Sequence, residues 1–181
     1  MNTKNKKLKI AIAGLGFGKK VHLEALKESD YLTPVAIYHY ETKQKSILEK
    51  ETGLEFFHNW EELVKSPKID GIIIATPPES RFKLAKQALE NNKNLLLEKP
   101  VSISSSEIEE LQRISLINNL SVCVDFEYRA VPLFLQTKKL IDENILGDIY
   151  LVKLDWLMGS RSDPKRAWNW YSLEEKGGGV I

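Results

Sequence analysis

The residue best placed to do chemistry in this chain is a lysine. The segment LLLEKPVS carries three leucines and then Glu98, Lys99 and Pro100. A run of apolar residues is typical of a strand that is buried on both faces of a parallel sheet, so Lys99 stands just past the end of such a strand. Its ammonium group could stabilise negative charge on a substrate oxygen as hydride leaves the adjacent carbon, and Glu98 could orient it. The alternative for a lone Glu-Lys-Pro is a turn that simply ends the strand.

A glycine-rich turn near the N-terminus is the second feature. In IAIAGLGFGKKVH, Gly14 would allow a tight turn, and Gly16 would let the backbone approach a pyrophosphate group because it carries no Cβ atom. The third glycine of the G-x-G-x-x-G pattern would fall at Lys19, and Gly18 comes one residue early. The pattern alone is weak and also fits a turn without a ligand. Its position between a strand and a helix favours dinucleotide binding.

The end of the second predicted strand bears on the choice of dinucleotide. An acidic residue that binds the adenosine ribose is expected about 20 residues beyond the glycines, and this chain has His39 there. Glu41 lies past the strand, and Lys43 and Lys45 could face a 2′-phosphate. We interpret this pattern as favouring NADP over NAD. The alternative is that the two lysines are solvated residues on a helix face.

The candidate site residues must be positioned by a folded domain, and the pattern of the first 126 residues predicts which fold this is. Strand-like and helix-like segments alternate regularly, the strands being LKIAIAG, TPVAIYH, LEFF, IDGIIIAT, NLLLE and SVCVDF. This alternation predicts a Rossmann-type α/β fold, a doubly wound parallel sheet. The carboxyl ends of parallel strands meet at one edge, so Thr76, Pro77, Glu98 and Lys99 should gather there. Cys123, inside the apolar SVCV, is expected to be a buried core residue.

The pattern changes after residue 126. A helix-like segment, PLFLQTKKLIDEN, leads into GDIYLVKLDWL, where the alternation of Ile149, Leu151, Leu154 and Trp156 predicts an antiparallel strand. We therefore expect a dinucleotide-binding domain at 1–126 and the incomplete start of a second domain at 127–181, too short to close a core of its own.

Composition excludes several other classes. The chain has 181 residues and a net charge of +1, which gives no field for nucleic acid or for acidic lipid. A single cysteine rules out an intrachain disulfide and a multi-cysteine metal site, and no metal site is predicted. No apolar stretch approaches the roughly 20 residues of a membrane span. We expect a cytoplasmic protein without nucleic-acid or membrane partners.

Three segments at their expected spacings, GLGFGKKVH, ATPPESR and LLLEKPVS, together resemble the Gfo/Idh/MocA family of oxidoreductases. The resemblance implies hydride transfer between a nicotinamide and a sugar, cyclitol or related alcohol. It also implies that an α/β domain with an open antiparallel sheet follows the dinucleotide-binding domain and serves substrate binding and oligomerisation. The site residues it implies are Gly14, Gly16, Phe17 and Gly18 for the cofactor phosphates, Thr76 and Pro77 beside the ribose and nicotinamide, Glu98 and Lys99 at the nicotinamide and substrate, and Arg129 just after the last strand. It further suggests a cis Lys99–Pro100 peptide bond.

The sequence departs from the family pattern in three places. Arg81 stands where many members have histidine, and His39 stands at the acidic position. The segment WNWYSLEEKGGGVI resembles the lead-in to the family's D-x-G-x-H-x-x-D motif, which supplies the aspartate and histidine of proton transfer. The chain is therefore expected to be the N-terminal part of a dehydrogenase, inactive alone, with His22, His39 and His58 excluded as the missing base by their early positions. The alternative is a non-catalytic dinucleotide-binding module or regulatory subunit. The resemblance also implies a possible homo-oligomer, because family members commonly pair through the open sheet. Separately, the apolar edge expected around IYLVKLDWL would invite self-association.

Overall fold

The computed structural model describes residues 6–157, 165, 172–176 and 178. Its centre is a sheet of six strands, ordered β3-β2-β1-β4-β5-β6, in which every neighbouring pair is parallel. The strands are β1 (Leu8–Ala13), β2 (Leu32–Tyr38), β3 (Glu55–Phe57), β4 (Gly71–Ile74), β5 (Asn94–Leu97) and β6 (Val122–Val124). The predicted doubly wound sheet is confirmed, and its strand order reverses between β1 and β4.

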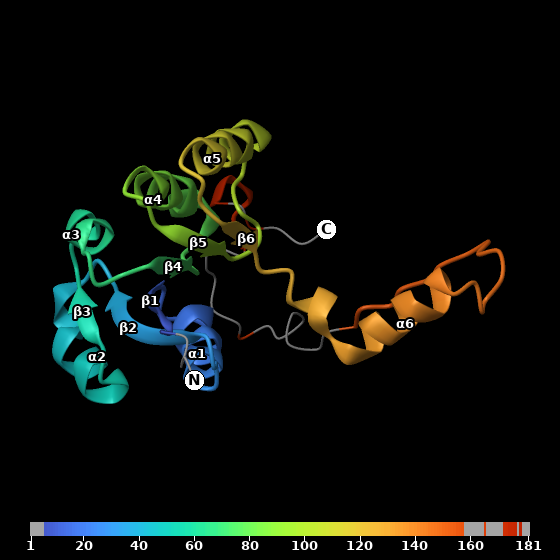
Figure 1. Ribbon diagram of the computed structural model, residues 1–181, viewed down its shortest axis with the longest axis horizontal. Helices are drawn as coiled ribbons and strands as arrows, with labels where there is room; N and C mark the ends of the chain where they lie inside the picture. The colour runs from blue at the N-terminus through green and yellow to red at the C-terminus, as the bar shows by residue number, and fades with distance from the viewer. Residues whose placement is uncertain (1–5, 158–164, 166–171, 177, 179–181) are drawn as a thin grey trace, which may run out of the picture.

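Helices cover both faces of this sheet (Figure 1). The helices that follow the strands are η1 (Gly18–His22) with α1 (Leu23–Lys27), η2 (Thr42–Gln44) with α2 (Lys45–Thr52), α3 (Trp60–Lys65), α4 (Pro78–Glu90) and α5 (Ser105–Ile117). Beyond β6 come η3 (Glu127–Ala130) and α6 (Pro132–Asp142), and a further short turn, η6, spans Glu174–Lys176. No helix in the described part of the chain is long and apolar enough to cross a membrane.

Alternate residues of the central strands pack into different hydrophobic clusters on the two faces of the sheet. In β1, Ala11 and Ala13 belong to the large cluster with α3, α4 and α5, whereas Ile10 and Ile12 pack with Leu23 of α1. A strand with helices on both faces must be apolar at every position. This requirement explains why β4 consists of glycine and three isoleucines, all of them buried.

The edge strand β6 corrects one expectation. Cys123 was predicted to be buried, but it is exposed. β6 is the last strand of the sheet that the described residues form, and β5 is its one neighbour there. A position on such a strand is covered less completely than its apolar sequence suggests.

The segment after α6 corrects a second expectation. Residues 149–157, predicted as an antiparallel strand, form no strand in the described structure. A strand requires a hydrogen-bonding partner, and the described residues offer this segment none. Its apolar side chains are exposed, with Leu151 at 84% and Leu157 at 94%. Figure 1 shows α6 projecting away from the sheet, and none of its residues is buried.

Candidate functional site

The glycine-rich turn between β1 and η1, the candidate phosphate-binding turn, contains three glycines with different structural roles. Gly14 has a φ of +121°, and a Cβ atom there would lie 2.5 Å from the carbonyl oxygen of Ala75. A Cβ atom on Gly18 would lie 3.0 Å from Cγ2 of Ile12. Gly14 therefore needs to be glycine for the fold itself, whereas a side chain at Gly18 would require its neighbour Ile12 to shift by a few tenths of an ångström. Gly16 differs, since a Cβ atom there would meet no atom within 4 Å, which leaves open space where a ligand would approach.

The residues beside this turn are also placed. Phe17 is partly exposed, and its ring meets the ring of His22 edge to face at a centroid distance of 5.2 Å. Lys19, which occupies the third glycine position of the pattern, forms an ion pair with Glu51 of α2. Its charged group is thus directed toward α2, and the lysine at this position does not obstruct the turn.

The end of β2 carries His39 as predicted. Its ring stacks on Tyr40 at a centroid distance of 4.6 Å, and its Nδ1 accepts a hydrogen bond from the amide of Glu41 at 3.2 Å. The carboxylate of Glu41 lies 3.2 Å from Nζ of Lys43. The acid nearest to the strand end is therefore neutralised by a lysine. Lys45 is exposed at the first position of α2.

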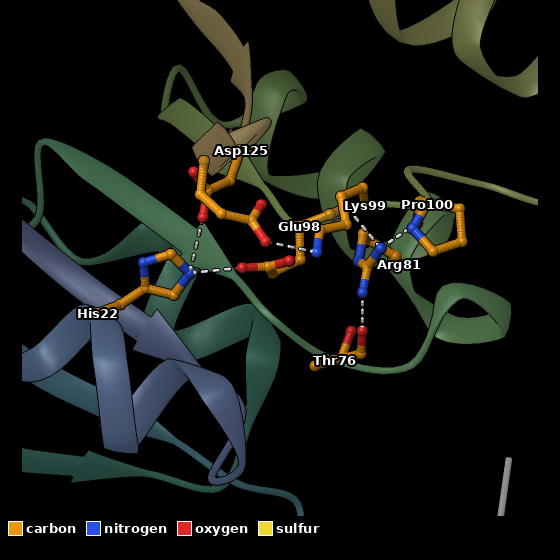
Figure 2. A network of polar contacts seen from close by, with 8 residues as sticks. His22, Thr76, Arg81, Glu98, Lys99, Pro100 and Asp125 are labelled. Atoms are coloured by element: carbon orange, nitrogen blue, oxygen red, sulfur yellow. Dashed lines mark hydrogen bonds and ion pairs between the residues drawn. The ribbon is translucent and has the colours of Figure 1, made fainter. Parts of the chain in front are cut away.

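The ends of β4 and β5 are joined by an arginine that sequence reasoning noted only as a departure from a pattern. Arg81 of α4 is 2% exposed. It donates hydrogen bonds to the carbonyl oxygens of Thr76, Glu98 and Pro100, the one to Glu98 at 2.5 Å. Figure 2 shows its guanidinium group between these turns. The planar fork of an arginine suits several acceptors at once, and it fixes Thr76 relative to the Glu98–Pro100 turn.

The Glu98–Pro100 turn brings charged groups together from three elements. The Lys99–Pro100 bond is cis, as predicted. The carboxylate of Glu98, which is 7% exposed, lies 2.8 Å from Nε2 of His22, and Oδ2 of Asp125 lies 3.6 Å from the same nitrogen. Nζ of Lys99 is 2.7 Å from Oε1 of Glu127. Glu98 was expected to orient Lys99, but its side chain faces His22 (Figure 2). The ammonium group of Lys99 instead donates a hydrogen bond to Glu127.

These contacts shift three pKa values. Burial would raise the pKa of Glu98, but its hydrogen bond to His22, the charge of His22, a hydrogen bond with Asp125 and the charge of Lys99 lower it overall. Burial, together with the hydrogen bond to Glu98 and its charge, raises the pKa of Asp125. The hydrogen bond to Glu127 raises the pKa of Lys99, with further help from the charges of Glu127 and Glu98. Lys99 is therefore a stable cation at neutral pH and suits charge stabilisation better than proton removal.

A cavity of about 810 Å³ opens beside Lys99. It is lined by Lys99, Pro100, Val101, Ser102, Ile108, Phe126, Glu127, Tyr128 and Arg129. The structure thus places Lys99 and the predicted Arg129 on one hollow, with the lysine side chain 42% exposed. Thr76 and Pro77 follow β4, next to the glycine turn, since Ala75 is the residue that Gly14 approaches.

The remaining predicted residues lie along the same sheet edge in the order of the strands. His39 follows β2, the glycines follow β1, Thr76 and Pro77 follow β4, and Glu98 and Lys99 follow β5. The edge therefore presents these residues in one row, and the strand order reverses at its middle. Such a row is the place where open α/β sheets bind extended ligands.

Sequence reasoning missed the roles of His22 and Arg81. Both lie about one turn into the helix that follows a central strand, η1 for His22 and α4 for Arg81. A helix that follows a parallel strand starts at the carboxyl edge of the sheet, so its first turns lie near the candidate site. This position in the sequence could have marked both residues as candidates for the site, although it does not identify the partners of either side chain.

Comparisons with known proteins agree with this geometry. Residues 8–126 match a family model described as an oxidoreductase family with an NAD-binding Rossmann fold, and residues 138–181 match the C-terminal alpha/beta domain of the same family. An uncharacterized oxidoreductase of Synechocystis sp. is 39% identical over 180 residues, which is 99% of this chain and 48% of that protein. Glucose-6-phosphate 3-dehydrogenase of Bacillus subtilis is 29% identical over 84% of this chain and 43% of its own length.

Solved structures show the same likeness. Scyllo-inositol dehydrogenase from Lactobacillus casei, crystallised with bound NAD(H) and scyllo-inositol, superposes with a TM-score of 0.73 at 26% identity, over 80% of this chain and 43% of that one. The chain spans about half the length, or less, of the curated relatives it matches. The family model covers well over half of the chain, and the chain therefore belongs to the Gfo/Idh/MocA family of oxidoreductases, with an NAD-binding Rossmann fold.

Proposed function

We propose that this chain binds a nicotinamide dinucleotide along the carboxyl edge of its sheet and supplies Lys99 to hydride transfer. The substrate would be a sugar, cyclitol or related alcohol. The observation that carries the proposal is the row of candidate residues, with His39 at one end, Gly16 at the centre and Lys99 at the other. An extended dinucleotide has the same order of parts, namely adenosine ribose, pyrophosphate and nicotinamide.

Two observations support the residue roles. The space left free at Gly16 suits a pyrophosphate, which would be held by backbone amides at the start of the helix. Lys99 is cationic and borders the cavity of about 810 Å³. It could stabilise an oxyanion that develops as hydride leaves the adjacent carbon. Thr76 and Pro77 would border the nicotinamide ribose, and Arg129 lines the same cavity as Lys99.

NADP is the proposed cofactor over NAD. The ribose hydroxyls of NAD are usually bound by an acid at the end of the second strand, and this chain has His39 there. The nearby Glu41 is paired with Lys43, which leaves no unpaired carboxylate among the described residues at that strand end. A phosphate on the ribose would therefore meet less repulsion than beside an unpaired acid, and Lys43 and Lys45 stand close along the chain.

Binding without turnover is the result we expect from these 181 residues. Lys99, with its raised pKa, cannot remove the hydroxyl proton, and the imidazole of His22 is engaged with Glu98. The described residues place no other general base beside Lys99, and without one a reaction of this kind loses typically a factor of about 10²–10⁴. The substrate is proposed to be bound with the help of the C-terminal domain that the family model matches at residues 138–181.

Calorimetric titration of the folded chain with NADP⁺ and NAD⁺ tests the proposal. We expect heat with both cofactors and tighter binding of NADP⁺. His39→Asp, which restores an acid at the strand end, should shift the ratio of the two affinities toward NAD⁺ by about tenfold, equivalent to about 1.4 kcal/mol. Gln112→Asp, at an exposed position on α5, is the control and should leave the ratio unchanged. No heat with either cofactor at millimolar concentration would overturn the proposed function.

A further inference from the structure

Three side chains with metal-binding atoms converge beside the turn that carries Lys99, and the proposed hydride transfer gives none of them a chemical role. Nε2 of His22 lies 2.8 Å from Oε1 of Glu98 and 3.6 Å from Oδ2 of Asp125, and the three ligand atoms all lie within 4.8 Å of one another. His22 and Glu98 are each 7% exposed. Figure 2 shows the imidazole facing both carboxylates. One imidazole and two carboxylates are a suitable ligand set for a divalent transition-metal ion.

The spacing of these atoms suits a shared ion. Bonds from Zn²⁺ to imidazole nitrogen or carboxylate oxygen are about 2.0–2.2 Å long, so two ligands of one ion lie about 3.0 Å apart at a right angle and about 3.4 Å apart at a tetrahedral angle. The two distances from Nε2 of His22, 2.8 and 3.6 Å, bracket this range. Small rotations of the side chains would therefore admit an ion, and the Asp125 side chain, which is 21% exposed, leaves a path for its entry.

The surrounding structure holds all three ligand residues in place. The backbone amides of Glu98 and Asp125 donate hydrogen bonds to the last residues of β4 and β5, at 3.1 and 2.8 Å. His22 ends the π-helical turn η1, and the ring of Phe17 packs against its imidazole at a centroid distance of 5.2 Å. Turns of this kind are frequent at functional sites. Ligands that are fixed by rigid elements form a metal site most readily, and these three are fixed before any ion binds.

The cluster also carries an excess of acidic oxygens. Lys99, the cation next to Glu98 in the chain, donates its hydrogen bond to Glu127. The other carboxylate oxygen of Glu127, Oε2, is buried and has no hydrogen-bond partner among the described residues. Buried carboxylates are costly unless they are paired or coordinate a metal. A divalent cation would neutralise the excess, and this reason for a cation is independent of the ligand spacing.

We propose that His22, Glu98 and Asp125 together bind a divalent transition-metal ion of the Zn²⁺ class, with water in its remaining coordination positions. Such an ion would tie η1 to the ends of β5 and β6, and would thereby fix the turn that presents Lys99. The site goes beyond the proposed function and is independent of it, because metal binding is measured without a cofactor. No metal site is expected from the sequence, since the three ligands come from segments that lie far apart in it.

Isothermal calorimetry with Zn²⁺ alone tests the site on the untagged chain. Cys123→Ser serves as the parent for all variants, because the exposed thiol of Cys123 is itself a zinc ligand. We expect one bound Zn²⁺ per parent chain and a Tm that rises with Zn²⁺ concentration, since the ion binds the folded state. His22→Gln and Asp125→Asn should each weaken binding by at least about tenfold and remove the rise in Tm. His58→Gln, the same substitution at an exposed histidine after β3, should keep both.

Mg²⁺ is the second probe, because it prefers six oxygen ligands in an octahedron and should bind this site far more weakly than Zn²⁺. Equal affinity for the two ions would contradict the inference, since the imidazole would then contribute nothing. A parent chain that binds no Zn²⁺, or binding that survives in both His22→Gln and Asp125→Asn, would overturn it.

Asp125→Asn decides alone should His22→Gln not fold by circular dichroism, because Asp125 is the most exposed of the three ligands. The outcome for this site is also separate from that for the cofactor. A chain that binds NADP⁺ or NAD⁺ but no Zn²⁺ would contradict the metal site alone. A chain that binds Zn²⁺ but neither cofactor would contradict the proposed function alone.

Discussion

At the scale of single residues, the glycines after β1 separate the needs of the fold from those of a ligand. Gly14→Val would force a side chain into the carbonyl of Ala75 at a φ of +121°, whereas Gly16→Val would meet no protein atom within 4 Å of its Cβ. We expect Gly14→Val to destabilise the chain by more than about 2 kcal/mol. Gly16→Val should change the unfolding free energy by less than about 1 kcal/mol and abolish cofactor binding.

Urea unfolding and calorimetry on the two variants check this prediction. Cofactor binding by Gly16→Val with an affinity near that of the parent would show that the open space at this glycine is not the pyrophosphate site. An equal loss of unfolding free energy in both variants would show that neither position of the turn can accommodate a side chain.

Some of these site residues could be predicted from the sequence and others could not, for a physical reason. Gly14, Gly16, His39 and Lys99 stand directly after strands, so strand prediction alone places them on one edge. The pairing of His22 with Glu98 joins residues 76 positions apart. No local pattern indicates which side chains will meet across such a separation, because the register of the sheet and the rotation of the helix decide it.

At the scale of elements, Arg81 fastens the turn after β4 to the turn after β5. Arg81→Met keeps the length of the side chain but leaves three carbonyl oxygens, those of Thr76, Glu98 and Pro100, without this donor. Since an unmet buried acceptor costs about 1–3 kcal/mol, we expect a loss of at least about 2 kcal/mol in unfolding free energy. Cofactor affinity should fall as well, because the nicotinamide end loses its alignment.

Chemical denaturation measures this loss, with Arg113→Met as the matched control. Arg113 is exposed on α5, and its replacement should change the unfolding free energy by no more than about 0.5 kcal/mol. Equal stability of the two variants would mean that the three hydrogen bonds contribute nothing to the fold.

Elements were predictable where both faces of the sheet are covered, and less so at its margins. β1, β4 and β5 are mostly apolar, and this composition favours strands that are covered on both faces. Apolar and polar residues alternate along segment 149–157 as they do in a strand. Alternation does not, however, provide the neighbouring strand to which such a segment must hydrogen-bond. Cys123 shows the same limit, since an apolar neighbourhood in the sequence does not reveal that a strand lies at the edge.

At the scale of the whole molecule, the chain exposes an apolar surface beyond the sheet. Leu133 of α6 is 78% exposed, and Leu151, Val152 and Leu154 are 84%, 78% and 73% exposed. An apolar surface of this extent is typical of an interaction site or of aggregation. We expect the isolated chain to self-associate as its concentration rises, and sedimentation velocity over a concentration series measures this.

Leu151→Lys with Leu154→Lys should reduce the association, because each lysine adds charge to the surface that would be covered. Leu116→Lys, at a 73% exposed position on α5, is the control and should leave the association unchanged. A parent chain that stays monomeric at all concentrations would contradict the prediction.

The strand order also has a consequence for the chain as it leaves the ribosome. β1 pairs first with β2, about two dozen residues later, but its other neighbour, β4, begins only at Gly71. Until then one side of β1 stays unpaired. Parallel pairings between distant segments form slowly, and an unpaired apolar edge invites wrong partners during that interval. The reversal of strand order at which the dinucleotide is proposed to bind thus also leaves β1 with an unpaired edge early in synthesis.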